Sequence, residues 1–251
     1  MKVMTYNILC GGLPHVNGTD RRKDILRLAE EHAPDVLALQ EANGFDEEGV
    51  LETYSKALSL PHYALSRGAL YEGHERYHVV IFSRYPISHI HEFAEGTFQS
   101  AALSVRLESP LGQFSLCAAH LHAYSETERI EELDYILAYQ DKFEDQLILG
   151  DLNAISRSDG YAADDSEFEL KYEVTDQLNQ KLVDVFAKTP ETKVPTFPSK
   201  IASDNTCKLP RRIDYMFASQ SLSERVASAR VVTSDLARRC SDHFPLIAGF
   251  E

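Results

Sequence analysis

Leu147-Ile148-Leu149-Gly150-Asp151-Leu152-Asn153 is the stretch that decides the fold of this chain. The apolar run predicts a buried β-strand, and the glycine, carboxylate and amide after it place polar side chains at one edge of a sheet. Taken alone, Gly150, Asp151 and Asn153 can also form an ordinary turn, because these residue types favour turns. Whether the segment is a turn or part of a site depends on how the other strands end.

The same arrangement recurs along the whole chain. Short apolar runs adjoin Asn, Gln, Glu, Asp or His in residues 3–7, 36–41, 117–120, 212–215 and 241–247. Loops at one end of the strands are expected to gather these side chains into one site. Hard oxygen ligands without a Cys/His cluster are typical of Mg²⁺ or Mn²⁺ rather than of structural zinc, and the sequence has no P-loop and no GxSxG elbow. Together these features predict a metal-dependent hydrolase acting at phosphorus.

Length and composition limit the classes of protein. With 251 residues, 43% of them hydrophobic, we expect a single domain over residues 1–251 with a sizeable core. The formal charge of -14 argues against tight, non-specific binding to long duplex nucleic acid, although it leaves room for a local basic pocket. Four widely spaced cysteines without a CxxC pair favour reduced thiols. Since neither a membrane span nor a signal peptide is visible, we expect a cytoplasmic monomer.

Strand-like and helix-like patterns alternate from end to end. Helices are predicted over 20–32 and 50–58 and after a capping box at 125–128. The predicted strands are residues 2–9, 35–40, 77–83, 101–107, 113–120, 146–150, 212–218, 228–233 and 244–250. Strands such as 147–149 are apolar on both faces, so they must be covered on both sides. The prediction is a four-layer αββα sandwich of the α/β (α+β) class, with two mixed β-sheets packed face to face and helices outside.

Several candidate site residues lie at these strand ends. Glu41 follows four apolar residues and Gln40, where a carboxylate costs several kcal/mol to desolvate unless a cation or hydrogen bonds compensate it. Asp151 and Asn153 lie two residues apart, so in extended backbone both point the same way and can reach one metal-bound water or phosphate. The alternatives are a solvent-facing acid for Glu41, a turn for Asp151 and Asn153, and a loop-holding amide for Asn7.

A histidine and an aspartate form a second candidate unit. His243 can act as a general base whose tautomer is fixed by Asp214, and Asp242 can serve a metal or help to orient the histidine. His120 and His122 alternate on one strand, so only one of them faces a given site, and His120 is the candidate because it adjoins the apolar run. A structural role is the commoner case for a lone histidine. The combined set of residues is what favours catalysis.

The ordered set of motifs resembles the endonuclease/exonuclease/phosphatase superfamily, which includes deoxyribonuclease I, exonuclease III-type nucleases, neutral sphingomyelinases and inositol polyphosphate 5-phosphatases. The matching segments are Thr5-Tyr6-Asn7, Gln40-Glu41, Ile81-Phe82-Ser83-Arg84-Tyr85-Pro86, His120-Leu121, Gly150-Asp151-Leu152-Asn153, Arg212-Ile213-Asp214-Tyr215 and Ser241-Asp242-His243. They span nearly the whole chain. The resemblance implies in-line attack of water at phosphorus, with a cation and hydrogen-bond donors stabilising charge on the equatorial oxygens.

The resemblance also implies roles for the metal-side and phosphate-side residues. Glu41 would bind the catalytic Mg²⁺, with Asn7 beside it contacting the metal shell or the phosphate, and Asp242 is a further candidate metal ligand. Asp151 and Asn153 would position the nucleophilic water and the scissile phosphate. Which group deprotonates the water, and whether one or two metals act, stays open.

The histidines place the chain within the superfamily. His243, held by Asp214, would contribute acid–base catalysis or stabilise the transition state. His120 is similar to the deoxyribonuclease I, sphingomyelinase and phosphatase branches, because exonuclease III-like enzymes carry a tyrosine there. In the deoxyribonuclease pattern a glutamate orients that histidine. Glu75 matches by position and Glu72 is its rival, with a surface loop acid as the alternative.

The sequence departs from the best-known branches, which limits the prediction of a substrate. It contains no Trp, and nothing corresponds to the disulfides of deoxyribonuclease I or to the membrane-binding hairpin expected of a sphingomyelinase. Arg212, just before Asp214, is a candidate substrate-side residue. Arg21 and Arg22 open a helix, which favours solvated surface charges for both.

Three interpretations therefore remain open. The first is a phosphodiesterase or phosphatase acting on a small or locally bound phosphoester. The second is a nuclease acting on DNA or RNA, which predicts a basic stripe beside the site despite the negative net charge. The third is a non-catalytic interaction module on the same fold. The presence of Glu41, Asp151, Asn153, Asp214 and His243 together argues against the third.

Overall fold

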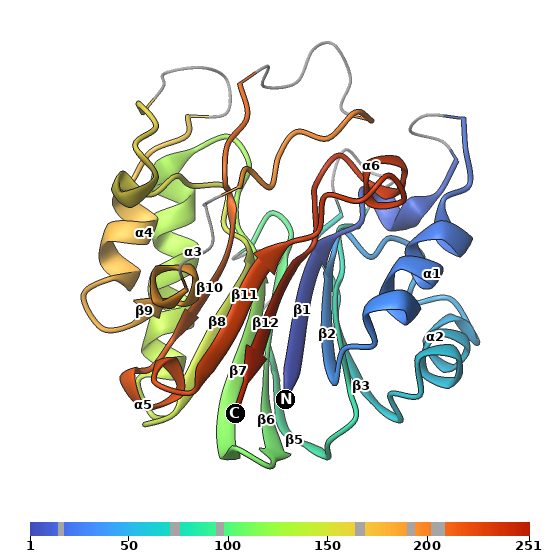
Figure 1. Ribbon diagram of the computed structural model, residues 1–251, viewed down its shortest axis with the longest axis horizontal. Coiled ribbons are helices and arrows are strands. Elements are labelled where there is room, and N and C mark those ends of the chain that lie inside the picture. Colours follow the sequence, from blue (N-terminus) through green and yellow to red (C-terminus); the bar gives the residue numbers. More distant parts are fainter. Residues whose placement is uncertain (15–17, 71–75, 94–97, 164–168, 190–193, 202–208) are drawn as a thin grey trace.

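The computed structural model describes the chain except residues 15–17, 71–75, 94–97, 164–168, 190–193 and 202–208. In the described residues two six-stranded sheets lie face to face and helices cover their outer faces (Figure 1). Each sheet contains one parallel strand pair among antiparallel ones, β1 with β2 and β7 with β8. The predicted four-layer sandwich with two mixed sheets is confirmed.

The first sheet holds the N- and C-terminal strands side by side. Its order is β11 (Val226–Val231), β12 (Leu246–Phe250), β1 (Lys2–Asn7), β2 (Val36–Gln40), β4 (Val79–Ser83) and β3 (His62–Ser66). The helices α1 (Arg22–His32), α2 (Val50–Leu58) and α6 (Ala237–Cys240) lie along its outer side (Figure 1). Ile25 and Leu28 of α1 pack on Leu37 and Leu39 of β2, so the apolar stripe of this helix faces the sheet.

The second sheet contains the apolar strand that ends at Gly150 and Asp151. Its order is β5 (Ile87–Glu92), β6 (Ala101–Ser109), β7 (Gly112–His120), β8 (Gln146–Asp151), β10 (Asp214–Ala218) and β9 (Val183–Asp184). The helices on this side of the molecule are α3 (Glu126–Gln140), α4 (Glu173–Leu178) and α5 (Gln220–Ser223). Short 3₁₀ turns occur at Arg157–Asp159 and Val185–Lys188, and a third, Cys10–Gly12, follows β1 of the first sheet. Ser125 caps α3 by accepting from the N–H of Glu128, as the capping box predicts.

The core between the sheets explains why β8 is apolar on both faces. Leu147 and Leu149 point into the layer between the two sheets, whereas Ile148 packs outward against Leu133 and Ile136 of α3. A strand covered on both sides loses the polar alternation of a half-exposed strand, as the sequence of β8 predicts. Its polar side chains are therefore confined to its two ends, Gln146 at the start and Asp151 at the end that faces the loops.

Two further observations bear on the sequence-based expectations. Cys10, Cys117 and Cys240 are buried and form no disulfide with a described residue, and Cys207 lies outside the described residues. Among the described helices, none combines the length and the apolar character needed to cross a lipid bilayer.

Candidate functional site

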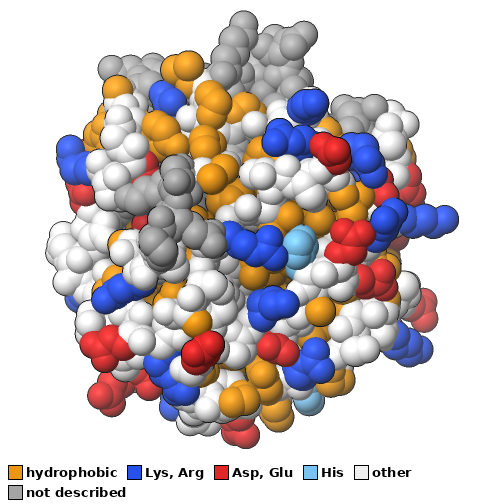
Figure 2. All heavy atoms as spheres, in the orientation of Figure 1, with side chains coloured by type: hydrophobic (Ala, Val, Ile, Leu, Met, Phe, Trp, Pro, Cys, Tyr) orange, Lys and Arg blue, Asp and Glu red, His pale blue; other side chains and the backbone are white. Residues whose placement is uncertain are grey.

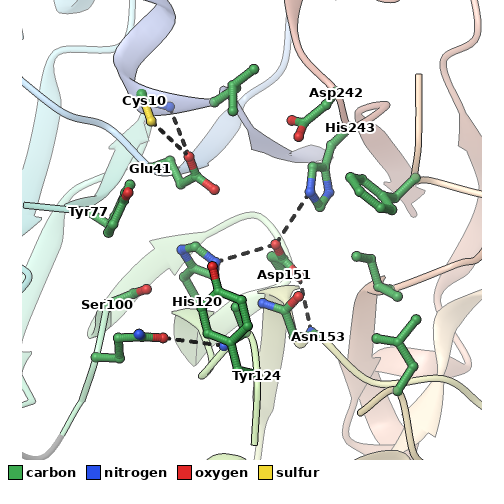
Figure 3. Close-up of a pocket in the computed structure, with 16 residues that line it drawn as sticks. Cys10, Glu41, Tyr77, Ser100, His120, Tyr124, Asp151, Asn153, Asp242 and His243 are labelled. Carbon is green, nitrogen blue, oxygen red and sulfur yellow. Dashed lines mark hydrogen bonds and ion pairs between the residues drawn. The ribbon is translucent and has the colours of Figure 1, made fainter. Parts of the chain in front are cut away.

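Asp151 lies at the centre of a cluster built from four strand ends. It is the last residue of β8 and pairs in register with His120, the last of β7, and with Asp214, the first of β10. Its Oδ2 accepts a hydrogen bond from Nδ2 of Asn7 at 2.9 Å. The same oxygen lies 3.5 Å from Nε2 of His120 and 3.6 Å from Nε2 of His243 (Figure 3). One carboxylate oxygen is therefore surrounded by three nitrogen atoms from three other segments.

The local backbone explains how Asp151 and Asn153 reach the same pocket. Gly150 has a φ of +130°, and a Cβ there would lie 2.0 Å from the carbonyl oxygen of Ala119, so only glycine fits between β8 and β7. Asn153 adopts a left-handed φ of 47°, its N–H donates to Oδ1 of Asp151 at 3.0 Å, and its Nδ2 donates to the carbonyl of Leu121 at 2.9 Å. A tight turn, and not the extended backbone expected from the spacing, brings the two side chains together.

His243 and Asp214 form a buried hydrogen-bonded pair. Nδ1 of His243 lies 2.9 Å from Oδ2 of Asp214, which leaves Nε2 facing Asp151. Burial alone would lower the pKa of His243, but the carboxylates of Asp214 and Asp151 outweigh it and hold that pKa well above its ordinary value. The ring nitrogen that is not bonded to Asp214, Nε2, is directed toward Asp151 and the pocket.

Glu41 lies across the pocket from His243, just after β2, with a left-handed φ of 53°. Its Oε1 accepts from Nδ2 of Asn7 at 3.0 Å. Its Oε2 accepts from the backbone N–H of Cys10 at 2.9 Å (Figure 3). Burial raises the pKa of Asp242 to about 6, and the negative charge of Glu41 adds to that rise while His243 opposes it. The three carboxylates, Glu41, Asp151 and Asp242, thus face one shared space.

Asn7 links the carboxylates of the two sheets. Its amide nitrogen donates both to Glu41 and to Asp151, while its Oδ1 accepts from the backbone N–H of Leu9 at 3.1 Å. In this arrangement Asn7 acts as a donor toward the carboxylates, and its oxygen is turned to the following loop. Its predicted contact with the metal shell or the phosphate stays a prediction.

The site residues surround one pocket of about 200 Å³, and Asn7 and Asp214 lie behind its lining, bonded to Asp151 and His243. The described lining comprises Leu9, Cys10, Glu41, Tyr77, Gln99, Ser100, His120, Ala123, Tyr124, Asp151, Asn153, Leu170, Phe197, Ile213, Asp242 and His243. This lining contains three carboxylates and two histidines. Among the described residues, no Lys or Arg lines the pocket. The sequence did not single out the apolar and aromatic members, because an isolated Tyr77, Tyr124 or Phe197 carries no signal in a chain with 12 Tyr and 12 Phe.

The donor set fits a hard divalent cation. Glu41 and Asp242 offer carboxylate oxygens close enough to repel each other, which a cation between them would relieve. Asp151, Asp214 and His243 also offer ligand atoms within 4.8 Å of one another. Nδ1 of His243 is already hydrogen-bonded to Asp214, however, so we favour Glu41 and Asp242 as the metal side of the pocket.

Arg212 does not line this pocket, which corrects its interpretation as a substrate-side residue. Its guanidinium is fully buried and forms paired hydrogen bonds to Asp159 and Asp184 at 2.6–3.1 Å. It also lies 4.4 Å from the ring centre of Tyr215. With both carboxylates and an aromatic face engaged, Arg212 ties the segment before Asp214 to the 3₁₀ turn Arg157–Asp159 and to β9. Its place two residues before Asp214 in the sequence therefore reflects packing.

Arg21 is also buried, and the expectation of a solvated charge is wrong for it. Its guanidinium donates to the carbonyls of Leu9 at 2.7 Å, Cys240 at 2.6 Å and Ile8 at 3.3 Å. These carbonyls belong to the segment after Asn7 and to the segment before Asp242, so Arg21 joins the two sides of the pocket. Arg22 is exposed and pairs with Asp20, as expected.

The remaining orienting residue lies outside the described part of the chain. Glu75, like its rival Glu72, falls within residues 71–75. His120, as predicted, and not His122, lines the pocket, and Nδ1 of His120 is buried without a hydrogen-bond partner among the described residues.

Comparison with known proteins agrees with this arrangement. The sequence matches the model of the Endonuclease/Exonuclease/phosphatase family over residues 4–243, whereas no curated protein matches it. Similar solved structures include an endonuclease/exonuclease/phosphatase family protein from Leptotrichia buccalis, with 21% identity, a TM-score of 0.75, and 100% of this chain and 99% of that chain covered. An AP endonuclease from Archaeoglobus fulgidus has 18% identity, a TM-score of 0.72 and the same coverage. The NExo 3′ phosphatase from Neisseria, bound to a product DNA hairpin, has 19% identity, a TM-score of 0.71 and again that coverage. By its sequence match and its fold, this chain belongs to the endonuclease/exonuclease/phosphatase family.

Proposed function

We propose that this protein is a divalent-metal-dependent phosphoesterase that hydrolyses a small or locally bound phosphoester. The observation that carries the proposal is the convergence of Asn7, His120 and His243 on Oδ2 of Asp151, with Glu41 and Asp242 across the same pocket. Proteins of this family are metal-dependent hydrolases of phosphoesters, so the residues fit the chemistry of the family. A non-catalytic module has no need of this buried, mutually oriented set.

One residue of the pocket would orient the attacking water, and two others would bind the phosphate. Asp151 is held rigidly by donors and can orient a water molecule for in-line attack, while Asn153, fixed by its own hydrogen bonds, lines the phosphate side. His243 presents Nε2–H toward the pocket and can donate to a phosphoryl oxygen as negative charge develops. Asp214 accepts from Nδ1–H, which orients the ring, and its negative charge favours the imidazolium form that also carries Nε2–H.

Glu41 and Asp242 would hold the metal ion, with Asn7 next to both sides of the pocket. A bound Mg²⁺ or Mn²⁺ would supply Lewis-acid polarisation of the phosphoester. Carboxylate oxygens suit either of these hard cations.

His120 is assigned as a second donor toward the phosphate. Its buried Nδ1 lacks a partner among the described residues, and an unsatisfied buried donor is costly. This supports the assignment of Glu75 as the acceptor that orients it. Both Glu75→Gln and His120→Ala are expected to lower kcat. The double variant Glu75→Gln/His120→Ala is expected to lose no more activity than His120→Ala alone, because Glu75 would act through His120.

The alternative function is a DNA or RNA nuclease. It is favoured by the solved structures named above, since one is an AP endonuclease and another is bound to a DNA hairpin. It is disfavoured by the net charge of -14 and by the absence of Lys and Arg from the described pocket lining. Activity on nucleic acid that collapses as salt rises would favour this alternative.

The test is a panel of Mg²⁺- and Mn²⁺-dependent assays on a phosphomonoester, a phosphodiester, DNA, RNA and lipid phosphodiesters. Asp151→Ala and His243→Ala are expected to lower kcat by about 10²–10⁴. The control is His89→Asn, which removes an exposed histidine from β5 and keeps a residue that tolerates its left-handed backbone. Inactivity of the wild type on every substrate, or full activity in both site variants, would refute the proposal.

A further inference from the structure

A second pocket, of about 530 Å³, lies beside α6 and next to the catalytic pocket. In the described residues it is lined by four cationic side chains, those of Arg21, Lys200, Arg238 and Arg239, and by one acid, Asp235. Figure 2 shows Lys and Arg side chains gathered around an acidic one on the upper right of the molecule, over the position of α6. We call this cavity the basic pocket.

The basic pocket reverses the charge of the molecule locally. The whole chain has a formal charge of -14, so a cavity in which cations outnumber acids is not explained by average composition. Clustered cations lower the free energy of a bound anion and raise its local concentration. The chemistry of the lining therefore favours an anionic ligand.

Arg21 supplies the strongest reason to expect an anion here. Its guanidinium is 1% exposed and donates only to backbone carbonyls, so no described carboxylate forms an ion pair with it. Its Nε is also buried without a hydrogen-bond acceptor among the described residues. A buried positive charge is costly unless it is compensated. An anion in the adjoining pocket would provide that compensation.

The other cations are available to bind a ligand. Lys200 is exposed and forms no ion pair with a described residue, and the guanidinium of Arg238 lies 5.4 Å from the ring centre of Phe244. Arg239 lies 3.9 Å from Asp24, but both side chains are largely exposed and such a pair is weak. These side chains can turn toward a phosphate at little cost.

The basic pocket is joined to the catalytic pocket through one backbone segment. Arg239 precedes Asp242 by three residues, which limits their Cα atoms to a separation of about 11 Å. The N–H of Ser199, the neighbour of Lys200, donates to the carbonyl of Asp242 at 2.6 Å. A substrate held at Asp151 can thus extend a neighbouring anionic group toward Lys200 and Arg238.

We propose that the basic pocket binds a second phosphate group of the substrate, next to the phosphate that is hydrolysed. This inference rests on the proposed phosphoesterase function and names its substrate class, a phosphoester that carries at least one additional phosphate. Two sources share this chemistry, a short single strand of nucleic acid and a small molecule with two phosphates.

Binding measurements test the proposal without relying on turnover. Calorimetric titrations compare a nucleoside 3′,5′-bisphosphate with the corresponding 5′-monophosphate. The wild type is expected to bind the bisphosphate about fivefold to tenfold more tightly, because charge-assisted contacts to a phosphate add to the affinity. Lys200→Gln/Arg238→Gln is expected to abolish this preference. The matched control, Arg27→Gln/Lys56→Gln, removes the same charge from exposed positions of α1 and α2 and is expected to keep it.

The outcomes separate this inference from the proposed function. Equal affinity for the two ligands, or a preference that survives in Lys200→Gln/Arg238→Gln, overturns the basic pocket as a phosphate site even if the enzyme is active. Preference for the bisphosphate in a protein that hydrolyses nothing supports the pocket and removes the phosphoesterase proposal. KM values for a short oligonucleotide and for the bisphosphate then distinguish the two sources of the second phosphate. KM is expected to rise in Lys200→Gln/Arg238→Gln only for the substrate class that uses the basic pocket.

Discussion

At the scale of single residues, Arg21 and Arg22 are neighbours with opposite environments. Arg21 is buried against three backbone carbonyls on two sides of the catalytic pocket, whereas Arg22 is exposed beside Asp20. A lysine keeps the charge but cannot span three carbonyls with a planar fork. Arg21→Lys is therefore expected to lower the free energy of unfolding by about 2–4 kcal/mol and to lower kcat.

Urea unfolding and steady-state kinetics measure this effect, with Arg22→Lys as the control. The exposed pair of Arg22 contributes little, so its variant is expected to stay within about 0.5 kcal/mol of the wild type. Equal losses in the two variants would show that Arg21 does not join the two sides of the pocket.

The two arginines also show the limit of the sequence at this scale. Glu41, Asp151 and Asn153 could be predicted because they follow apolar strands, and His243 because it lies just before one, within an ordered set of such motifs. Arg21 could not, because its acceptor Cys240 lies 219 positions away and the start of a helix looks the same whichever way the side chain turns. A contact between distant segments leaves no local pattern.

At the scale of elements, the close approach of β7 and β8 depends on one glycine. In Gly150→Ala the Cβ would meet the carbonyl oxygen of Ala119 at 2.0 Å, and the φ of +130° is strained for alanine. We expect a loss of at least about 3 kcal/mol in the free energy of unfolding. Thermal unfolding measures it. Gly112→Ala is the control, because Gly112 also has a positive φ but has no atom within 4 Å of its Cβ, and its cost should be about 1 kcal/mol.

Helix α3 is linked to two loops beside the pocket through Glu132. Its carboxylate accepts from the N–H groups of Gln99 and His122, and burial raises its pKa to about 7 from 4.5 despite these bonds. The folded state thus binds the proton more tightly than the unfolded state does. The contribution of this group to stability is full below pH 4.5 and is lost as the pH rises toward 7.

Raising the pH from about 5 to about 8 should therefore lower the free energy of unfolding of the wild type by about 2 kcal/mol relative to Glu132→Gln. Urea unfolding at several pH values measures the difference in free energy of unfolding between the two proteins. The contributions of other titrating groups cancel in this difference because both proteins contain them. Parallel stability curves for the two proteins would contradict this account of Glu132.

Elements with a strong pattern could be predicted and weak ones could not. The strands at the centre of each sheet and helices α1, α2 and α3 carry clear apolar periodicity. β3, β5 and β9 were not predicted, because β3 and β5 are edge strands without a strong apolar run and β9 has only two residues. Edge strands are held by pairing with a neighbour, which a single segment of sequence does not encode.

At the scale of the whole molecule, positive charge is scarce and local. The chain has 25 Lys and Arg against 39 Asp and Glu, and four of the described cations line the basic pocket whereas none lines the catalytic pocket. Binding of long duplex nucleic acid depends on many phosphate contacts, each of which releases counter-ions. This distribution suits a substrate with few phosphates.

The dependence of kcat/KM on salt concentration tests whether the enzyme contacts only a few phosphates. For a reporter with one phosphate, kcat/KM is expected to change by less than about threefold between 50 and 200 mM salt, since enzymes with 6–10 phosphate contacts lose about 10³–10⁵ in affinity over that range. A bisphosphate should show a steeper slope than the reporter, and Lys200→Gln/Arg238→Gln should remove the excess while Arg27→Gln/Lys56→Gln retains it. A drop of a thousandfold on oligonucleotides, unchanged by Lys200→Gln/Arg238→Gln, would instead require a nucleic-acid surface formed by other cations of this acidic molecule.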